Sequence, residues 1–261
     1  MSFWARLATW FDPPEQEPVT FDPAWIAVLE ANIPVYARLP AALQQQLHER
    51  ITGLVHRVHF EACGGLELTD EMVLTIAGQA GMLVLSETGI PFPNLRTVLV
   101  YPAAYRATET LHGPAGIVMQ REVVRLGQSS TSGTVVLAWN AVQQGARNCF
   151  DGHNVTFHEF AHQLDQAHGG GDGIPRLGPA HRYARWTQVI TAGHARLERM
   201  AAAGKRNVLD VYGATNLAEF FAVATEAFFE KPRQLKRKQP ALYAELETFY
   251  QLDPATWFSQ G

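Results

Sequence analysis

The feature that most constrains the fold is the motif H-E-x-x-H at residues 158–162. Apolar residues around it recur at helical spacing, which predicts a helix over residues 155–166. Residues four apart on a helix lie one above the other on the same face, so both imidazole rings can reach one ion. Such a helix has to face another element that supplies further ligands. The motif therefore favours a fold in which distant segments of the chain meet.

Two histidines do not complete a metal site, because a catalytic zinc site normally has three protein ligands. Imidazole and carboxylate groups in an open tetrahedral site favour zinc. The downstream side chains that could supply the third ligand are His168, His181, His194, Glu198, Glu219, Glu226 and Glu230. Glu219 is the first choice because it begins a predicted helix beside a loop, and Glu226, on the same face, is the second. Asn216-x-x-Glu219 also has the pattern of a helix capping box, so spacing leaves both roles of Glu219 open.

Two further acids flank the histidine pair. Glu159 lies beside the ligand face and can reach a water held by a metal, which is the position of a general base. Asp165 shares the face of the histidines, so it could hold a ring N–H or form a salt bridge at the helix end. A structural alternative for the whole motif is a pair of hydrogen-bonded histidines in a half-buried helix.

The rest of the chain predicts an α+β fold that is mostly helical with a small sheet. Helical patterns cover residues 40–58, 69–83, 179–203, 217–229 and 240–250. Short β-type runs lie at residues 97–101, 117–119, 123–124 and 133–139, and they predict a mostly antiparallel or mixed sheet. The run at 133–139 could be an edge strand that pairs with an extended peptide, or an interior strand.

Composition narrows the class of protein. The 261 residues carry 21 basic and 25 acidic side chains, a balance that argues against direct nucleic-acid binding. The sequence contains no run of 18 apolar residues, so it predicts no membrane span. Cys63 and Cys149 could form one bridge at most, so a reduced cytoplasmic protein is favoured. The apolar stripe within residues 3–11 could pack on the main body or lie on a membrane surface.

Two segments together resemble a known family. These are His158-Glu-Phe-Ala-His162-Gln-Leu-Asp165 and Tyr212-Gly-Ala-Thr-Asn-Leu-Ala-Glu219-Phe-Phe-Ala-Val. They resemble the Mlc titration factor A family of bacterial zinc metallopeptidases, of the glutamate-zincin type. The Tyr-x6-Glu arrangement is similar to that in the catalytic domain of anthrax lethal factor. One departure is Asn216-Leu217, where many members have Asp-Pro; it alters the helix start and leaves the ligand in place.

The resemblance implies a single zincin-like domain over residues 1–261, with an N-terminal extension at 1–20 and a catalytic core at 60–261. It implies one Zn²⁺ ion held by His158, His162 and Glu219. It further implies that Glu159 is the catalytic acid and base and that Tyr212 stabilises the transition state. From the residues alone, Tyr212 reads as a buried tyrosine with a satisfied hydroxyl.

The resemblance also implies partners. The substrate would be a peptide or protein, with endopeptidase and aminopeptidase activity both left open. The family's role implies a link to glucose phosphotransferase uptake through the transcriptional repressor Mlc. The alternative function is a regulatory protein that binds the repressor without catalysis.

Overall fold

The computed structural model describes residues 20–87, 89–90, 92–112, 118–167 and 170–258. The apolar stripe expected within residues 3–11 lies outside these ranges. The elements of the N-terminal half that precede β2 are α2 (Trp25–Asn32), η1 (Tyr36–Arg38), α3 (Ala41–Arg57), β1 (His59–Ala62) and α4 (Asp70–Met82). The predicted helices at 40–58 and 69–83 are thereby confirmed. Thr69 caps α4 by accepting a hydrogen bond from the backbone N–H of Met72.

The main sheet is mixed and has the order β1–β2–β6–β5. Its further strands are β2 (Thr97–Tyr101), β5 (Gly127–Ser129) and β6 (Thr134–Ala138). β1, β2 and β6 run parallel, and β5 is antiparallel to β6. β6 therefore lies inside the sheet, so of the two alternatives for the run at 133–139 the interior strand is confirmed and the edge strand is wrong. The edge is β5, which pairs on the outer side of β6.

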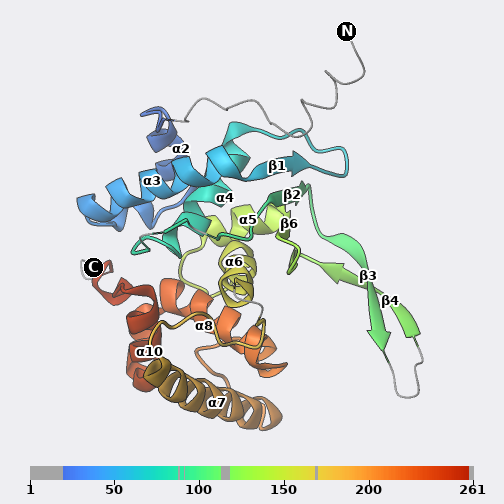
Figure 1. The fold of residues 1–261 in the computed structure, drawn as a ribbon, viewed down its shortest axis with the longest axis vertical. Helices are drawn as coiled ribbons and strands as arrows, with labels where there is room; N and C mark the ends of the chain where they lie inside the picture. Colours follow the sequence, from blue (N-terminus) through green and yellow to red (C-terminus); the bar gives the residue numbers. More distant parts are fainter. Residues whose placement is uncertain (1–19, 88, 91, 113–117, 168–169, 259–261) are drawn as a thin grey trace.

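The β-type runs at 117–119 and 123–124 do not join this sheet. They fall in β4 (Val118–Arg125), which pairs with β3 (Tyr105–His112) in a separate antiparallel ribbon. Residue 117 lies outside the described residues. Figure 1 shows this ribbon extending away from the body of the molecule. Alternating β-forming residues predict a strand but do not specify its partner.

The C-terminal half is helical. Its elements are α5 (Trp139–Arg147), α6 (Val155–Gln166), α7 (Ala180–Ala202), η3 (Val211–Ala214), α8 (Leu217–Glu230), α9 (Pro232–Lys238), α10 (Pro240–Tyr250) and η4 (Pro254–Thr256). The helices predicted at 155–166, 179–203, 217–229 and 240–250 are confirmed within one residue at each end. The α+β class is confirmed as well.

The position of the site follows from α6 and α8. In Figure 1, α6 lies between the sheet with α4 and α5 on one side and the C-terminal helices on the other. Every residue of α8 from Phe220 to Glu230 is buried. Buried hydrophobic side chains from α2 to the C-terminal segment form one continuous cluster. A helix enclosed in this way holds its polar side chains in fixed positions.

Two expectations about the chain as a whole can be compared with the structure. Cys63 and Cys149 are both free thiols, so the possible bridge between them is absent. No helix within the described ranges is both long and apolar enough to span a bilayer.

Candidate metal centre

The histidine pair lies on α6, whose start is fixed by its own sequence. The side chain of Asn154 caps the helix by accepting a hydrogen bond from the backbone N–H of Phe157, at 3.0 Å. Phe157 and Phe160 are buried on the core side. Burial of this apolar face turns His158 and His162 toward α8.

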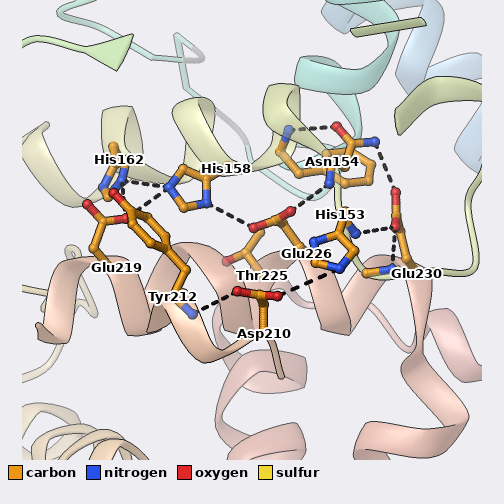
Figure 2. Close-up of polar contacts among 12 residues, drawn as sticks. His153, Asn154, His158, His162, Asp210, Tyr212, Glu219, Thr225, Glu226 and Glu230 are labelled. Atoms are coloured by element: carbon orange, nitrogen blue, oxygen red, sulfur yellow. Dashed lines mark hydrogen bonds and ion pairs between the residues drawn. The ribbon is translucent and has the colours of Figure 1, made fainter. Parts of the chain in front are cut away.

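Three ligand-type atoms converge between α6 and α8 (Figure 2). His158 Nε2 lies 2.9 Å from Glu219 Oε2, and His162 Nε2 lies 3.4 Å from the same oxygen. The two Nε2 atoms are 3.3 Å apart. Metal–ligand bonds of about 2.0–2.1 Å to three corners of a tetrahedron would separate those corners by about 3.3–3.4 Å. The donor set and its spacing therefore fit one metal ion.

Glu219 combines the two roles that its spacing left open. Its backbone N–H donates to the Asn216 side chain at 2.9 Å, which caps α8. Its carboxylate faces the two imidazole rings. Burial alone would raise the pKa of this carboxyl group, but the hydrogen bonds from His158 and His162 outweigh it and lower the pKa to about 2. Glu219 is thus a carboxylate held in the charged form that a metal ligand needs.

The other residues considered for the third ligand lie elsewhere. His194 and Glu198 face each other on α7 at 3.6 Å, and His181 is also on α7. His168 is outside the described residues. Within the described part of the chain, His158, His162 and Glu219 form the one group of three or more potential ligands whose atoms lie within 4.8 Å of one another.

Glu226 has a role that spacing did not identify. Its Oε1 lies 2.9 Å from His158 Nδ1, the ring nitrogen that faces away from His162. Its Oε2 accepts a hydrogen bond from the backbone N–H of Asn154 at 2.6 Å. Burial would lower the pKa of His158, but hydrogen bonds to Glu219 and Glu226 raise it well above its usual range. A carboxylate that holds one ring nitrogen fixes the tautomer and directs the other nitrogen at the metal position.

Glu230, one turn further along α8, anchors the loop before α6. Its carboxylate accepts hydrogen bonds from the backbone N–H groups of Gly152 and His153 and from the Asn154 side chain, at 2.8, 3.1 and 3.1 Å. Burial raises the pKa of this carboxyl group to about 8 despite these donors.

We expect Glu230 to make folding stability depend on pH. A carboxyl group whose pKa is higher in the folded than in the unfolded chain stabilises the fold below its unfolded pKa, and this contribution is lost as pH rises toward about 8. Thermal unfolding of the wild type should therefore show a declining melting temperature between about pH 5 and pH 8. The Glu230→Gln variant, which cannot ionise, should show a weaker decline. Equal slopes for the two proteins would contradict the assignment.

Glu159 lines the same cavity as the histidine pair. Its side chain is buried, and this burial raises its pKa although the charges of His158 and His162 oppose the shift. A carboxyl group with a raised pKa is better matched to proton transfer near neutral pH.

Tyr212 is not the buried tyrosine that the residues alone predict. It is 52% exposed, so the expectation of a buried tyrosine is wrong. It lies in η3, where the Asp210 side chain accepts a hydrogen bond from the Tyr212 backbone N–H at 2.7 Å. Its ring centre is 5.9 Å from that of His158. Figure 2 shows the Tyr212 ring beside His158, His162 and Glu219.

Among the residues that the structure describes, Asp165 contacts a backbone N–H and takes neither of the two roles considered for it. It is buried, and its Oδ2 accepts a hydrogen bond from the backbone N–H of Gly173 at 2.8 Å. This contact ties the end of α6 to the chain that follows. The helical repeat places Asp165 on the same helix as the histidines, but it does not give the path of the loop that follows, which supplies the partner of Asp165.

The three converging ligands, Glu159 and Tyr212 open on one cavity. Its volume is about 1260 Å³, and its walls come from β5, α6, η3 and α8. The lining residues include His158, Glu159, His162, Tyr212 and Glu219. A cavity of this size beside three converging ligand atoms leaves room for a polymer segment to approach a bound ion.

Similarity to known proteins covers most of the chain. Residues 9–251 match the family described as glucose-regulated metallo-peptidase M90. A protein of Synechocystis sp., named only as uncharacterized, is 39% identical over 233 residues, which cover 89% of this chain and 85% of that protein. Mlc titration factor A of Edwardsiella ictaluri is 34% identical over 228 residues, which cover 85% of each chain. Mlc titration factor A of Klebsiella pneumoniae is 34% identical over 228 residues, covering 85% of this chain and 84% of that protein. The resemblance inferred from the two motif segments is confirmed: the chain belongs to the M90 family of glucose-regulated metallopeptidases.

Proposed function

We propose that this protein is a zinc-dependent peptidase of the glutamate-zincin type. The observation that carries the proposal is the convergence of His158, His162 and Glu219 next to the buried carboxyl group of Glu159. A site that only bound a metal would not need an acid beside it. The family membership supports a metallopeptidase, and the donor set of two imidazoles and one carboxylate favours zinc.

Each side chain has a separate task in the proposed reaction. His158, His162 and Glu219 would hold the ion, and Glu226 would orient the His158 ring. Zinc supplies Lewis-acid chemistry when bound, which makes a water more acidic and polarises a carbonyl. Glu159 accepts the proton of the attacking water and returns it to the leaving amine. The Tyr212 hydroxyl donates a hydrogen bond to the carbonyl oxygen as its negative charge develops.

An extended substrate would lie along β5. Gln128 and Ser129 of this edge strand line the same cavity as His158 and Glu159. Within the described ranges β5 pairs with β6 on one side and with no strand on the other, so this other side could take a peptide strand by backbone pairing. The strand proposed to pair with the substrate is therefore β5 and not β6, which lies inside the sheet.

Metal removal tests the proposal directly. Purified protein should contain one zinc per chain by elemental analysis and should cleave members of a peptide library. Dialysis against a chelator should remove the metal. The rate of peptide cleavage should then fall at least about 100-fold, since the Lewis acid and the activated water are lost together. Adding back stoichiometric zinc should restore both. Full cleavage by protein shown to be free of metal would contradict the proposal.

A second candidate function is a repressor-binding regulator. It is favoured by the name of the relatives, Mlc titration factor A, which links those proteins to Mlc. A Glu159→Gln variant separates the two functions, because binding of purified Mlc should survive the substitution whereas cleavage should not. We also propose a cytoplasmic location, which the two free thiols support.

A further inference from the structure

The edge strand β5 passes α6 at an unusually short distance. A β-carbon added at Gly127 would lie 2.5 Å from Glu159 Oε1, 2.7 Å from Glu159 Cγ and 2.7 Å from Val155 Cγ2. Carbon atoms in contact are about 3.5–4.0 Å apart, so both carbon–carbon contacts would be overlaps, and the carbon–oxygen distance of 2.5 Å is shorter still. Val155 and Glu159 lie one helical turn apart on the face of α6 that meets β5. Glycine is therefore the residue that lets this face of α6 approach the strand.

The restriction at Gly127 comes from its neighbours and not from its backbone. Gly127 is absent from the residues with positive φ, so an alanine could adopt the same backbone conformation. Its place in the β5–β6 ladder, opposite Leu137, also holds its backbone in a strand geometry. An alanine at this position would have to displace the Glu159 side chain or the helix that carries it.

Glu159 has few ways to yield. Movement of its carboxylate end alone would relieve the contact at 2.5 Å but not the contact at its Cγ, which is set by rotation about the Cα–Cβ bond. A change of that rotation moves the whole carboxyl group out of its buried position beside His158 and His162. Shifting α6 instead would disturb the contacts of His158 with Glu219 and Glu226.

We propose that Gly127 is a positioning residue for Glu159: by lacking a β-carbon, it leaves the space in which the Glu159 carboxyl group lies next to the metal ligands. This inference rests on the proposed function, because it assigns to Gly127 the placement of the proposed general base. It makes the edge strand responsible for the base as well as for one wall of the cavity.

The test is Gly127→Ala in the full-length, zinc-loaded protein. We expect kcat for peptide cleavage to fall roughly 10- to 100-fold, since displacement of a catalytic group by about 1 Å has an effect of this size. KM should stay within about two-fold and zinc should remain at one per chain, because the ligands are not touched. A crystal structure of the variant should show the Glu159 carboxyl group displaced by about 1 Å or more. Unchanged kcat, or an unmoved Glu159, would overturn the inference.

Two glycine variants serve as matched controls. Gly53 has no heavy atom within 4 Å of an added β-carbon, and Gly53→Ala should leave cleavage unchanged and should not lower the melting temperature, since alanine favours the α3 helix in which it lies. At Gly81 the added atom would lie 2.8 Å from Leu47 Cδ1, in the core between α3 and α4. Gly81→Ala should therefore lower the melting temperature with kcat unchanged. Together the two controls distinguish a loss of stability caused by crowding in the core from a loss of kcat caused by displacement of Glu159.

Double variants isolate the path through Glu159. In a Glu159→Gln background, Gly127→Ala should change the residual rate by less than about two-fold, because the group that it displaces no longer acts as a base. The double variant Gly127→Ala with Val155→Ala removes the overlap with the Val155 side chain but keeps the overlap with Glu159. Its stability should therefore recover while kcat stays low. An equal loss of rate in both backgrounds, or recovery of kcat by Val155→Ala, would overturn the inference. Undiminished cleavage by Glu159→Gln itself would instead refute the proposed function, and the crystal structure of Gly127→Ala would still decide whether Gly127 sets the position of Glu159.

Discussion

Glu159→Gln is expected to abolish nearly all peptide cleavage while the protein keeps its zinc and its fold. The two side chains have the same shape, so the packing of residue 159 against Gly127 is preserved. The amide cannot accept a proton from water, and loss of a general base lowers rates by about 10²–10⁴-fold. The measurement is kcat/KM on a peptide substrate, with zinc content and melting temperature recorded on the same preparation.

The matched control for this variant is Glu61→Gln. Glu61 lies on β1, away from the cavity, and its side chain is 57% exposed. Its substitution makes the same chemical change and should leave kcat/KM unaltered. Cleavage by Glu159→Gln at the rate of this control would show that the water is activated without Glu159.

Glu219→Ala is expected to lose its zinc during dialysis, whereas Glu226→Ala keeps a metal site of lower affinity. Glu219 supplies one of the three converging ligand atoms, so its removal leaves two imidazoles only. Glu226 contacts the far nitrogen of His158, and loss of such a partner weakens metal binding by about 10–100-fold. Competition with a chelator of known affinity measures both effects.

The variant Glu226→Gln refines this comparison. It retains a side-chain oxygen for His158 but removes the charge, so its zinc affinity should lie between those of the wild type and Glu226→Ala. The reverse order, with Glu226→Ala free of metal and Glu219→Ala loaded, would assign the third ligand to Glu226. The same measurements on Glu198→Gln, whose acid faces His194 on α7, should match the wild type.

The sequence predicted the helical part of the fold well, for a physical reason. Helices such as α6 and α8 bury one face or nearly all faces, and their apolar residues repeat every three to four positions. The strand β5 gave no such signal. It consists of Gly127, Gln128 and Ser129, residues with little preference for strands, although its partner β6 follows directly in the chain.

The candidate site was predictable to the extent that it lies within single helices. The spacing of His158 and His162 follows from the helical repeat, whereas Glu219 could be ranked first only with the help of the family resemblance. Glu226 was considered as a ligand, because spacing gives its face but not the nitrogen that it meets. The contact of Gly127 with Glu159 joins an edge strand to a helix, and no local pattern announces it.

The three acids of α8 have a consequence for how the chain can change its length. Glu219, Glu226 and Glu230 each contact a different point of α6 or of the loop that precedes it. One inserted residue between Glu219 and Glu226 would turn the two ends of the helix by about 100° relative to each other. One end could then keep its partners only if the other lost them. The number of residues between Glu219 and Glu226 is therefore fixed, and an insertion or deletion there should be far more damaging than a substitution that keeps the length of α8.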